Sequence, residues 1–222
     1  MDEATPGRRE RKKAELRTRI SDVATALFLD RGFDAVSVTE VAEAADVARP
    51  TVFAHFARKE DLLFDRYPEA EALVVAAITD RPAGTSAVAA LSELLVRLAD
   101  ERHPLSTIRG RFRRFWVVVG ESRALQARAR ELTEQLEQAI AAAMRQTEVP
   151  EPELTAALAV AAYRTVHLQS VRRILAGDDP DLVAGDHRDR IITALATVDR
   201  LGEQAISPST ERSVPIASDQ LT

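Results

Sequence analysis

VTEVAEAADVARPTVFAHFARKEDLL, residues Val38–Leu63, is the most informative stretch of this chain. Ser37 and Glu40 have the spacing of a capping box, in which the hydroxyl caps a new helix and the carboxylate reaches back to the Ser37 amide. This alanine-rich helix breaks at Asp46–Ala48, and a second, short helix is predicted from about Arg49 to Phe56. Helix, tight turn and short helix form the plan of a helix-turn-helix, whose second helix enters the DNA major groove.

The short helix is predicted to have one buried face and one open face. Val52 and Phe56 are four residues apart and share a face, so they anchor the helix in a core. The opposite face carries small residues (Pro50, Thr51 and Ala54), with His55 at its edge. A small outer face lets the backbone lie close to base edges, where methyl groups can touch thymine.

Charged residues flank this open face. Arg49, at the helix start, can reach a guanine edge or a phosphate. Lys59, at the start of the next helix, adds its charge to free backbone amides and suits a phosphate. The alternative for these side chains is an ordinary solvated surface. The predicted DNA-contact residues are Thr39, Arg49, Pro50, Thr51, Ala54, His55 and Lys59.

A basic segment precedes the motif. Apolar residues recur at helical spacing from Leu16 to Phe28, which predicts a first helix that Gly32 ends. Just before and within it lie seven basic residues, Arg8, Arg9, Arg11, Lys12, Lys13, Arg17 and Arg19, against Glu10 and Glu15. Such local positive charge can bind phosphate, while the net charge of −5 on the whole chain limits non-specific binding to nucleic acid. A solvated helix face is an equal alternative, so contact between Arg8–Lys13 and DNA stays open.

Longer helices are predicted after this region. One begins near Arg58, with Pro68 kinking or restarting it, and runs through Ile78 to a loop at Asp80–Ser86. Further helices are predicted at about 87–101, 105–119, 121–146, 152–176 and 186–205. The last residues, 207–222, lack periodicity and are predicted to be a disordered tail.

Residues Leu16–Leu63 resemble the DNA-binding domain of the tetracycline-repressor-like (TetR) family of bacterial transcriptional regulators. The resemblance is carried by LRTRISDVATALFLDRGFDAVSV and most specifically by TVFAHF followed by KEDL. It implies an all-helical homodimer with three N-terminal helices for DNA and a variable C-terminal domain for a small ligand. Asp46 and Pro50 depart from common family residues but suit a turn and an early helix position. Phe53 stands where tyrosine is frequent, so it lacks a hydroxyl for phosphate and is expected to pack only.

The predicted fold class is therefore all-α, with an N-terminal three-helix helix-turn-helix DNA-binding domain and a larger C-terminal helical domain for ligand binding and dimerisation. The predicted boundaries are a basic arm at 1–13, the DNA-binding domain at 14–66, the helical ligand-binding and dimerisation domain at 67–206 and the tail at 207–222.

Aromatic residues concentrate in the predicted body at Phe112, Phe115 and Trp116, the only tryptophan. Tyr163 and His167, one turn apart on a later helix, give them polar partners. A pocket lined by these five residues would suit a largely apolar ligand with one or two hydrogen-bonding points. The alternative is an aromatic core with satisfied polar tips.

The dimer surface is predicted on the helices at 152–176 and 186–205. Small residues permit close helix approach at Ala156, Ala157, Ala161 and Ala162, and Ile191, Leu195 and Val198 form an apolar stripe. Such a stripe could equally be internal core. The family resemblance favours a four-helix bundle across a two-fold axis.

Composition bounds the remaining possibilities. With 45% hydrophobic and 29% charged residues, the 222-residue chain can bury a core, and its lack of cysteine excludes disulfides and fits a reducing cytoplasm. Neither an apolar run long enough for a membrane nor a metal, cofactor or catalytic motif is recognisable. The expected partners are an operator in double-stranded DNA, an unknown small-molecule effector and a second copy of the chain. A repressor is favoured; the alternatives are an activator of the same family, or a helical ligand carrier or protein-interaction module.

Overall fold

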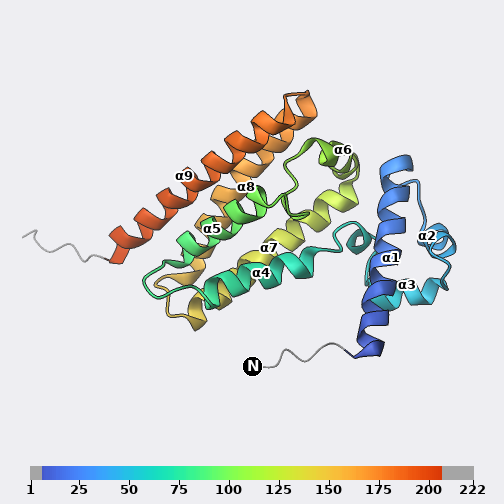
Figure 1. The fold of residues 1–222 in the computed structure, drawn as a ribbon, viewed down its shortest axis with the longest axis horizontal. Helices are drawn as coiled ribbons and strands as arrows, with labels where there is room; N and C mark the ends of the chain where they lie inside the picture. Colours follow the sequence, from blue (N-terminus) through green and yellow to red (C-terminus); the bar gives the residue numbers. More distant parts are fainter. Residues whose placement is uncertain (1–6, 207–222) are drawn as a thin grey trace, which may run out of the picture.

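The computed structural model describes residues 7–206, with side chains described as far as Gly202, and over these residues it is helical and without strands (Figure 1). The predicted all-α fold is confirmed. The predicted tail at 207–222 and the first six residues of the predicted arm lie outside the described residues.

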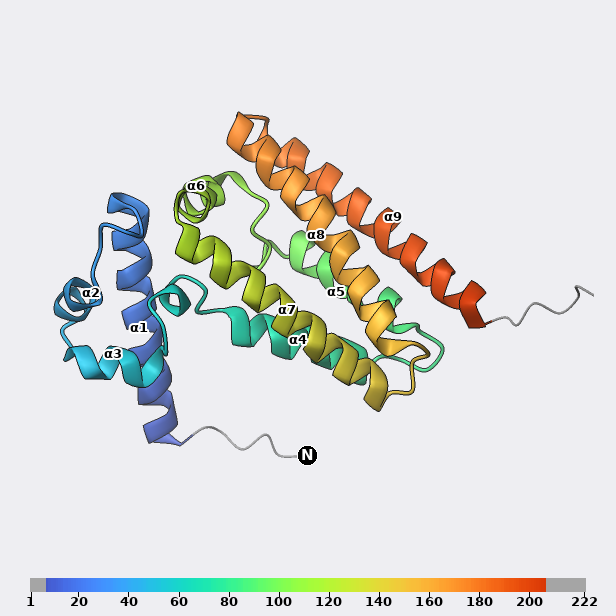
Figure 2. The same cartoon turned by 180° about the vertical axis from the view of Figure 1, so that it is seen from behind.

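Two groups of helices follow one another along the chain (Figure 1). The first group is α1 (Arg8–Arg31), α2 (Val38–Ala44) and α3 (Arg49–His55), followed by a 3-10 turn, η1 (Glu60–Leu62). The second group is α4 (Tyr67–Thr79), α5 (Ala87–Asp100), a 3-10 turn η2 (Gly110–Phe112), α6 (Arg113–Glu121), α7 (Arg123–Gln146), α8 (Pro152–Ala176) and α9 (Pro180–Ile206). The second group forms the larger body, and α1 stands between it and the pair α2–α3 (Figures 1 and 2).

Local sequence signals set the geometry of the first group. The Ser37 hydroxyl accepts a hydrogen bond from the Glu40 amide at 3.2 Å, and the Glu40 carboxylate accepts one from the Ser37 amide at 2.8 Å. The predicted capping box is thus confirmed. Asp46 follows α2 with a φ of 52°, a left-handed turn conformation that Asp tolerates. Val52 and Phe56 are buried with Phe28 in one core, as predicted.

The basic residues of the predicted arm are continuous with the first helix. Residues from Arg8 to Lys13 form the first turns of α1, which continues without a break to Arg31. Lysine, arginine, glutamate and leucine are good helix formers, and this stretch contains neither proline nor glycine before Gly32. Gly32 ends the helix with a φ of 86°, as expected of a glycine that leaves a helix.

Three other predicted boundaries are corrected. Residues after Arg58 form only η1, and α4 begins at Tyr67, with Pro68 in its first turn, where its missing N–H costs nothing. Residues 105–109 are not helical, and α6 begins at Arg113 rather than near 105. The last helix begins at Pro180, six residues earlier than expected. At the start of this helix, Pro180 packs against Gly110, where an added Cβ atom on residue 110 would lie 3.0 Å from the proline ring.

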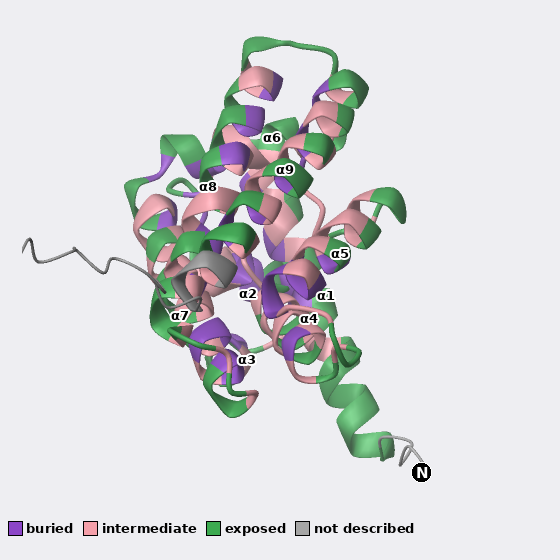
Figure 3. Ribbon diagram, turned by 90° about the vertical axis from the view of Figure 1, so that its left-hand side faces the viewer, coloured by how far each residue is buried: buried purple, intermediate pink, exposed green. Residues whose placement is uncertain are grey.

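The apolar interior has two main parts. The first joins the α1–α3 group to the body, because Val118, Val119 and Leu125 of α6 and α7 pack into the same core as Phe28 and Phe56. The second lies within the body between α4, α5, α7, α8 and α9. Figure 3 shows the buried turns facing inward and the first turns of α1 exposed.

The stripe Ile191, Leu195 and Val198 belongs to this second core, so its prediction as a dimer surface is wrong. These residues share the face of α9 that packs on α5 and α8 of the same chain. The large apolar side chains that α8 and α9 expose are instead Leu154, Leu158, Leu168, Leu182, Ile192 and Leu201.

Candidate DNA interface and body cavity

The face of α3 that the sequence predicts to be open is exposed or half-buried. Arg49, Pro50 and Ala54 are exposed, and Thr51 and His55 are half-buried. Thr39, the second residue of α2, is also exposed. Because α2 and α3 lie on the side of α1 remote from the body, the other described helices do not cover this face (Figures 1 and 2). Backbone and small side chains of α3 can therefore approach a groove closely.

Phe53 packs against Arg49 rather than into the core. Its side chain is 43% exposed, and the guanidinium carbon of Arg49 lies 5.5 Å from its ring centroid. Such a cation–π contact at an exposed site stabilises by roughly 0.5–1 kcal/mol. Phe53 therefore holds the Arg49 side chain along the exposed face of α3.

Arg49→Ala is expected to weaken binding to a selected DNA site and to relax the base preference at one position of each half-site. The loss is about 1–3 kcal/mol if the contact to guanine is bidentate. Competition binding against each single-base variant of the site measures both effects. Unchanged base preference at every position would mean that Arg49 contacts only a phosphate or solvent and reads no base.

The C-terminal end of α3 is fixed by Arg17, which in the sequence carries no signal beyond its place in a basic run. Its guanidinium donates to the backbone oxygen of His55 and, at 3.3 Å, to that of Asp65. The same group lies 4.1 Å from the centroid of the Phe56 ring. Arg17 therefore joins α1, the end of α3 and the segment leading into α4.

Lys59 has an internal partner. Its ammonium donates to the backbone oxygen of Phe33 at 2.6 Å and lies 4.0 Å from the Phe33 ring centroid. Burial lowers its pKa, an effect opposed by the nearby carboxylates of Asp34, Glu60 and Glu40. An ammonium has three N–H donors, so the bond to Phe33 leaves donors for a phosphate. The phosphate contact of Lys59 stays a prediction.

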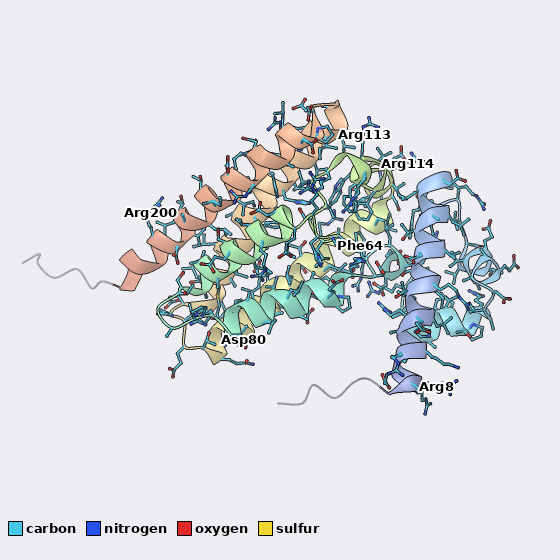
Figure 4. The ribbon with its side chains drawn as sticks, in the orientation of Figure 1. Arg8, Phe64, Asp80, Arg113, Arg114 and Arg200 are labelled. Atoms are coloured by element: carbon cyan, nitrogen blue, oxygen red, sulfur yellow. The ribbon has the colours of Figure 1, made fainter. Side chains whose placement is uncertain are left out.

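Polar contacts tie the body to the α1–α3 group. Arg114 of α6 lies between α6 and α1 (Figure 4) and donates to the backbone oxygen of Leu29 at 2.6 Å. Ser122, between α6 and α7, donates to the Asp34 carboxylate at 3.0 Å. Arg128 of α7 forms an ion pair with Asp61 of η1 at 2.8 Å. Movement of α6 or α7 would thus be passed to the α1–α3 group.

The body contains a small cavity of about 30 Å³. Its polar wall is formed by Tyr163 and His167 of α8 with His187 and Arg188 of α9, and another wall by Leu105–Ile108. The Tyr163 hydroxyl lies 3.4 Å from His167 Nδ1, and Ser170 Oγ lies 3.1 Å from His187 Nδ1. Burial, reinforced by the charge of His187, lowers the pKa of His167 to about 3; burial mainly lowers that of His187 to about 4. Both imidazoles are therefore neutral near pH 7, and each has one ring nitrogen that donates a hydrogen bond and one that accepts.

The five predicted pocket residues are only partly brought together. Trp116 lies behind the wall, with its ring centroid 5.1 Å from that of His167 and its indole N–H donating to Thr107 at 3.2 Å. Phe115 packs between Trp116 and Phe64, and Phe112 packs on Phe115; neither lines the cavity. His187, which lines it, was missed, because a single histidine in the sequence carries no signal of its spatial neighbours.

Neither a metal-binding cluster nor a membrane-spanning helix occurs among the residues that the structure describes. Three or more His, Cys, Asp or Glu side chains that could hold a metal ion do not come together among these residues. Over the same range, none of the helices combines the length and apolar character needed to cross a membrane.

Comparison with known proteins gives matches in both sequence and fold. The family described as bacterial regulatory proteins, tetR family, matches residues 20–65. The HTH-type transcriptional regulator TcmR of Streptomyces glaucescens is 36% identical over 87 residues, which are 39% of this chain and 38% of TcmR. The HTH-type transcriptional repressor KstR2 of Rhodococcus jostii (strain RHA1) is 31% identical over 134 residues, 50% of this chain and 66% of KstR2. The matches thus span less than two thirds of either relative.

A solved structure gives a fold match over most of the chain. NalD, the secondary repressor of the MexAB-OprM multidrug efflux pump in Pseudomonas aeruginosa, is 19% identical, with a TM-score of 0.52. The match covers 82% of this chain and 97% of NalD. At that identity, the likeness shows a common fold.

Proposed function

We propose that this chain, which belongs to the TetR family of bacterial regulatory proteins, is a dimeric transcriptional repressor. It would bind a near-palindromic operator in double-stranded DNA, and a small effector would release it. The observation that carries this proposal is the open face of α3, with small residues and an Arg49 side chain held along it by Phe53. Two such helices, one per subunit, would enter successive major grooves. Action on chromosomal DNA favours the cytoplasm as its location.

Selection of bound fragments from random DNA by the purified protein tests this function. A repressor or activator enriches one near-palindromic sequence and binds it with strong salt dependence. A ligand carrier or protein-interaction module enriches none. Transcription from a promoter that carries the selected site, with and without the protein, then separates repression from activation.

For assembly, we propose that α8 and α9 pair with those of a second copy in a four-helix bundle. Leu154, Leu158 and Leu168 recur on the face of α8 opposite its core contacts, at helical spacing. On α9, Leu182 and Ile192 lie on the outward side, away from the buried Ile191 and Leu195. A second copy would remove these side chains from water, which is favourable in proportion to the apolar area buried.

For the effector, we propose binding at the cavity between α5, α8, α9 and residues 105–108. Its volume of about 30 Å³ has room for a few water molecules, whereas ligand pockets measure roughly 300–1,000 Å³. A ligand must therefore enlarge it. Residues 105–108 are the non-helical wall, and the Trp116 hydrogen bond to Thr107 links their displacement to α6. Through the Arg114 contact with Leu29, α6 can then shift α1 and the separation of the two α3 helices.

This coupling is a shift between two states of the dimer, and it requires an effector that prefers the state that does not bind DNA. Besides apolar side chains, the lining contains Ser106, Thr107, Tyr163, two neutral imidazoles and Arg188. This lining suits a largely apolar effector with one or two hydrogen-bonding groups.

Tyr163→Phe is expected to raise the effector dose about fivefold, since loss of one hydrogen bond costs on the order of 1 kcal/mol. A compound library screened for DNA release supplies the effector. Because Trp116 is the sole tryptophan and contacts His167, its emission should change over the same concentration range as DNA release. Both dose curves should shift together in the variant.

Phe112→Ala is the matched control, because Phe112 lies in the same aromatic group without lining the cavity. Its dose curves should coincide with those of the parent. DNA release without any change in Trp116 emission, and with equal doses in parent and Tyr163→Phe, would place the effector elsewhere.

A further inference from the structure

The N-terminal part of α1 extends beyond the core of the α1–α3 group. Every residue from Arg8 to Glu15 is exposed, and Figure 3 shows these first turns of α1 in green. The first buried residue of the helix is Ile20. At a rise of 1.5 Å per residue, Arg8 lies about 18 Å along the axis from Ile20. The fold of the α1–α3 group does not need this extension, since its core contacts begin after it.

Helical spacing divides the basic residues of the extension between two sides. Arg9, Lys13 and Arg17 recur every four residues, and Ile20 and Ala24 continue this row into the core. The row therefore lies on the side of α1 that faces α3. At about 100° per residue, Arg8 and Lys12 lie on the opposite side, away from the core.

Contacts of the described residues place this row beside the end of α3. Arg17 donates to the backbone oxygen of His55, the last residue of α3. The charge of Lys13 is close enough to lower the pKa of the His55 imidazole, after the larger effect of burial. Arg9 lies one turn further out on the same row. Among the ion pairs of the described side chains, none involves Arg9 or Lys13.

We propose that Arg9 and Lys13 bind phosphates of the duplex that flank the stretch contacted by α3. This inference rests on the proposed DNA-binding function and extends its interface to a second element. Two cations without an acidic partner, carried on a preformed helix beside the contact helix, suit a polyanion. Phosphates follow one another every 3.4 Å of axis along one strand, so residues a helical turn apart meet different phosphates. Such contacts position the protein on DNA and carry no base specificity.

The test compares two double variants of the full-length protein. One carries Arg9→Gln with Lys13→Gln, and the other Arg8→Gln with Lys12→Gln. Each removes two positive charges from the same exposed helix end and introduces the same good helix former, so only the side of the helix differs. Affinity for the selected operator is measured against salt concentration, and hydroxyl-radical footprints are recorded.

For the Arg9/Lys13 variant, the log–log salt slope should become shallower by about 0.9 per lost contact, roughly 3.6 for a dimer. Protection of the sugars next to the α3 site should disappear, while base preference is retained. The Arg8/Lys12 variant should keep both the slope and the footprint of the parent.

An equal loss of slope in both variants would show a diffuse field from the helix end and overturn the assignment. If both double variants keep the salt slope and footprint of the parent, Arg9 and Lys13 lie on a solvated face and the proposal is wrong. The proposed DNA-binding function would still stand. A parent protein that selects no DNA sequence would overturn the proposed function as well, so the two failures are distinguishable. Circular dichroism melting of all three proteins confirms that α1 and its core remain folded.

Discussion

A Leu195→Glu variant is expected to lose its folded body rather than its partner subunit. Leu195 is 1% exposed and packs in the core that also contains Ile78 and Met144. Truncating a buried leucine costs about 2–5 kcal/mol. Glutamate at this position adds an unpaired buried carboxylate. Since whole domains are stable by only about 5–15 kcal/mol, the cooperative thermal transition should vanish or fall far below that of the parent.

Circular dichroism and sedimentation measure this outcome. Leu195→Met is the control, because it keeps an apolar side chain of similar volume and should melt near the parent temperature. A Leu195→Glu protein that kept parental helicity and sedimented as a monomer would mean that this side of α9 meets a second copy. The packing of α9 on α5 and α8 would then be wrong.

The opposite result is expected for Leu158→Glu combined with Ile192→Glu. These side chains are 38% and 37% exposed and lie outside the core clusters, so their replacement should leave helicity and melting little changed. In the proposed bundle, however, each glutamate would be buried against a second copy, which association should not tolerate. The protein should sediment as a monomer.

Operator affinity should fall with dimerisation. Linked binding of two half-sites exceeds single-site affinity by about 10²–10⁴, and a monomer forfeits this gain. Ala76→Glu, an exposed position on α4, is the control for added charge and should remain a dimer with parental affinity. A double variant that stays dimeric would remove the outward sides of α8 and α9 from the interface.

Local features were predictable from sequence because their causes lie within a few residues. The capping box at Ser37, the turn at Asp46 and the inward side of α3 each depend on neighbours in the chain. Helical periodicity located the long helices for the same reason, with the errors confined to their ends.

The burial of the apolar stripe of α9 shows what helical periodicity cannot predict. It identifies which residues share a side of a helix, but not whether that side meets the same chain or another. Ile191 and Ile192 are adjacent in sequence, yet one is buried in the body and the other is open. The contacts of Arg17 with His55 and of His187 with Ser170 join residues 38 and 17 positions apart, so only the assembled fold brings them together.

The shared core sets where this protein can be divided to build chimaeric sensors. A hybrid that joined residues 1–66 to a foreign sensing domain would discard Val118, Val119 and Leu125, which complete the core around Phe28 and Phe56. It would also discard Arg114 and Arg128, the partners of Leu29 and Asp61. A workable graft must therefore transplant α6 and the start of α7 together with the N-terminal helices, so the exchangeable module is discontinuous in sequence.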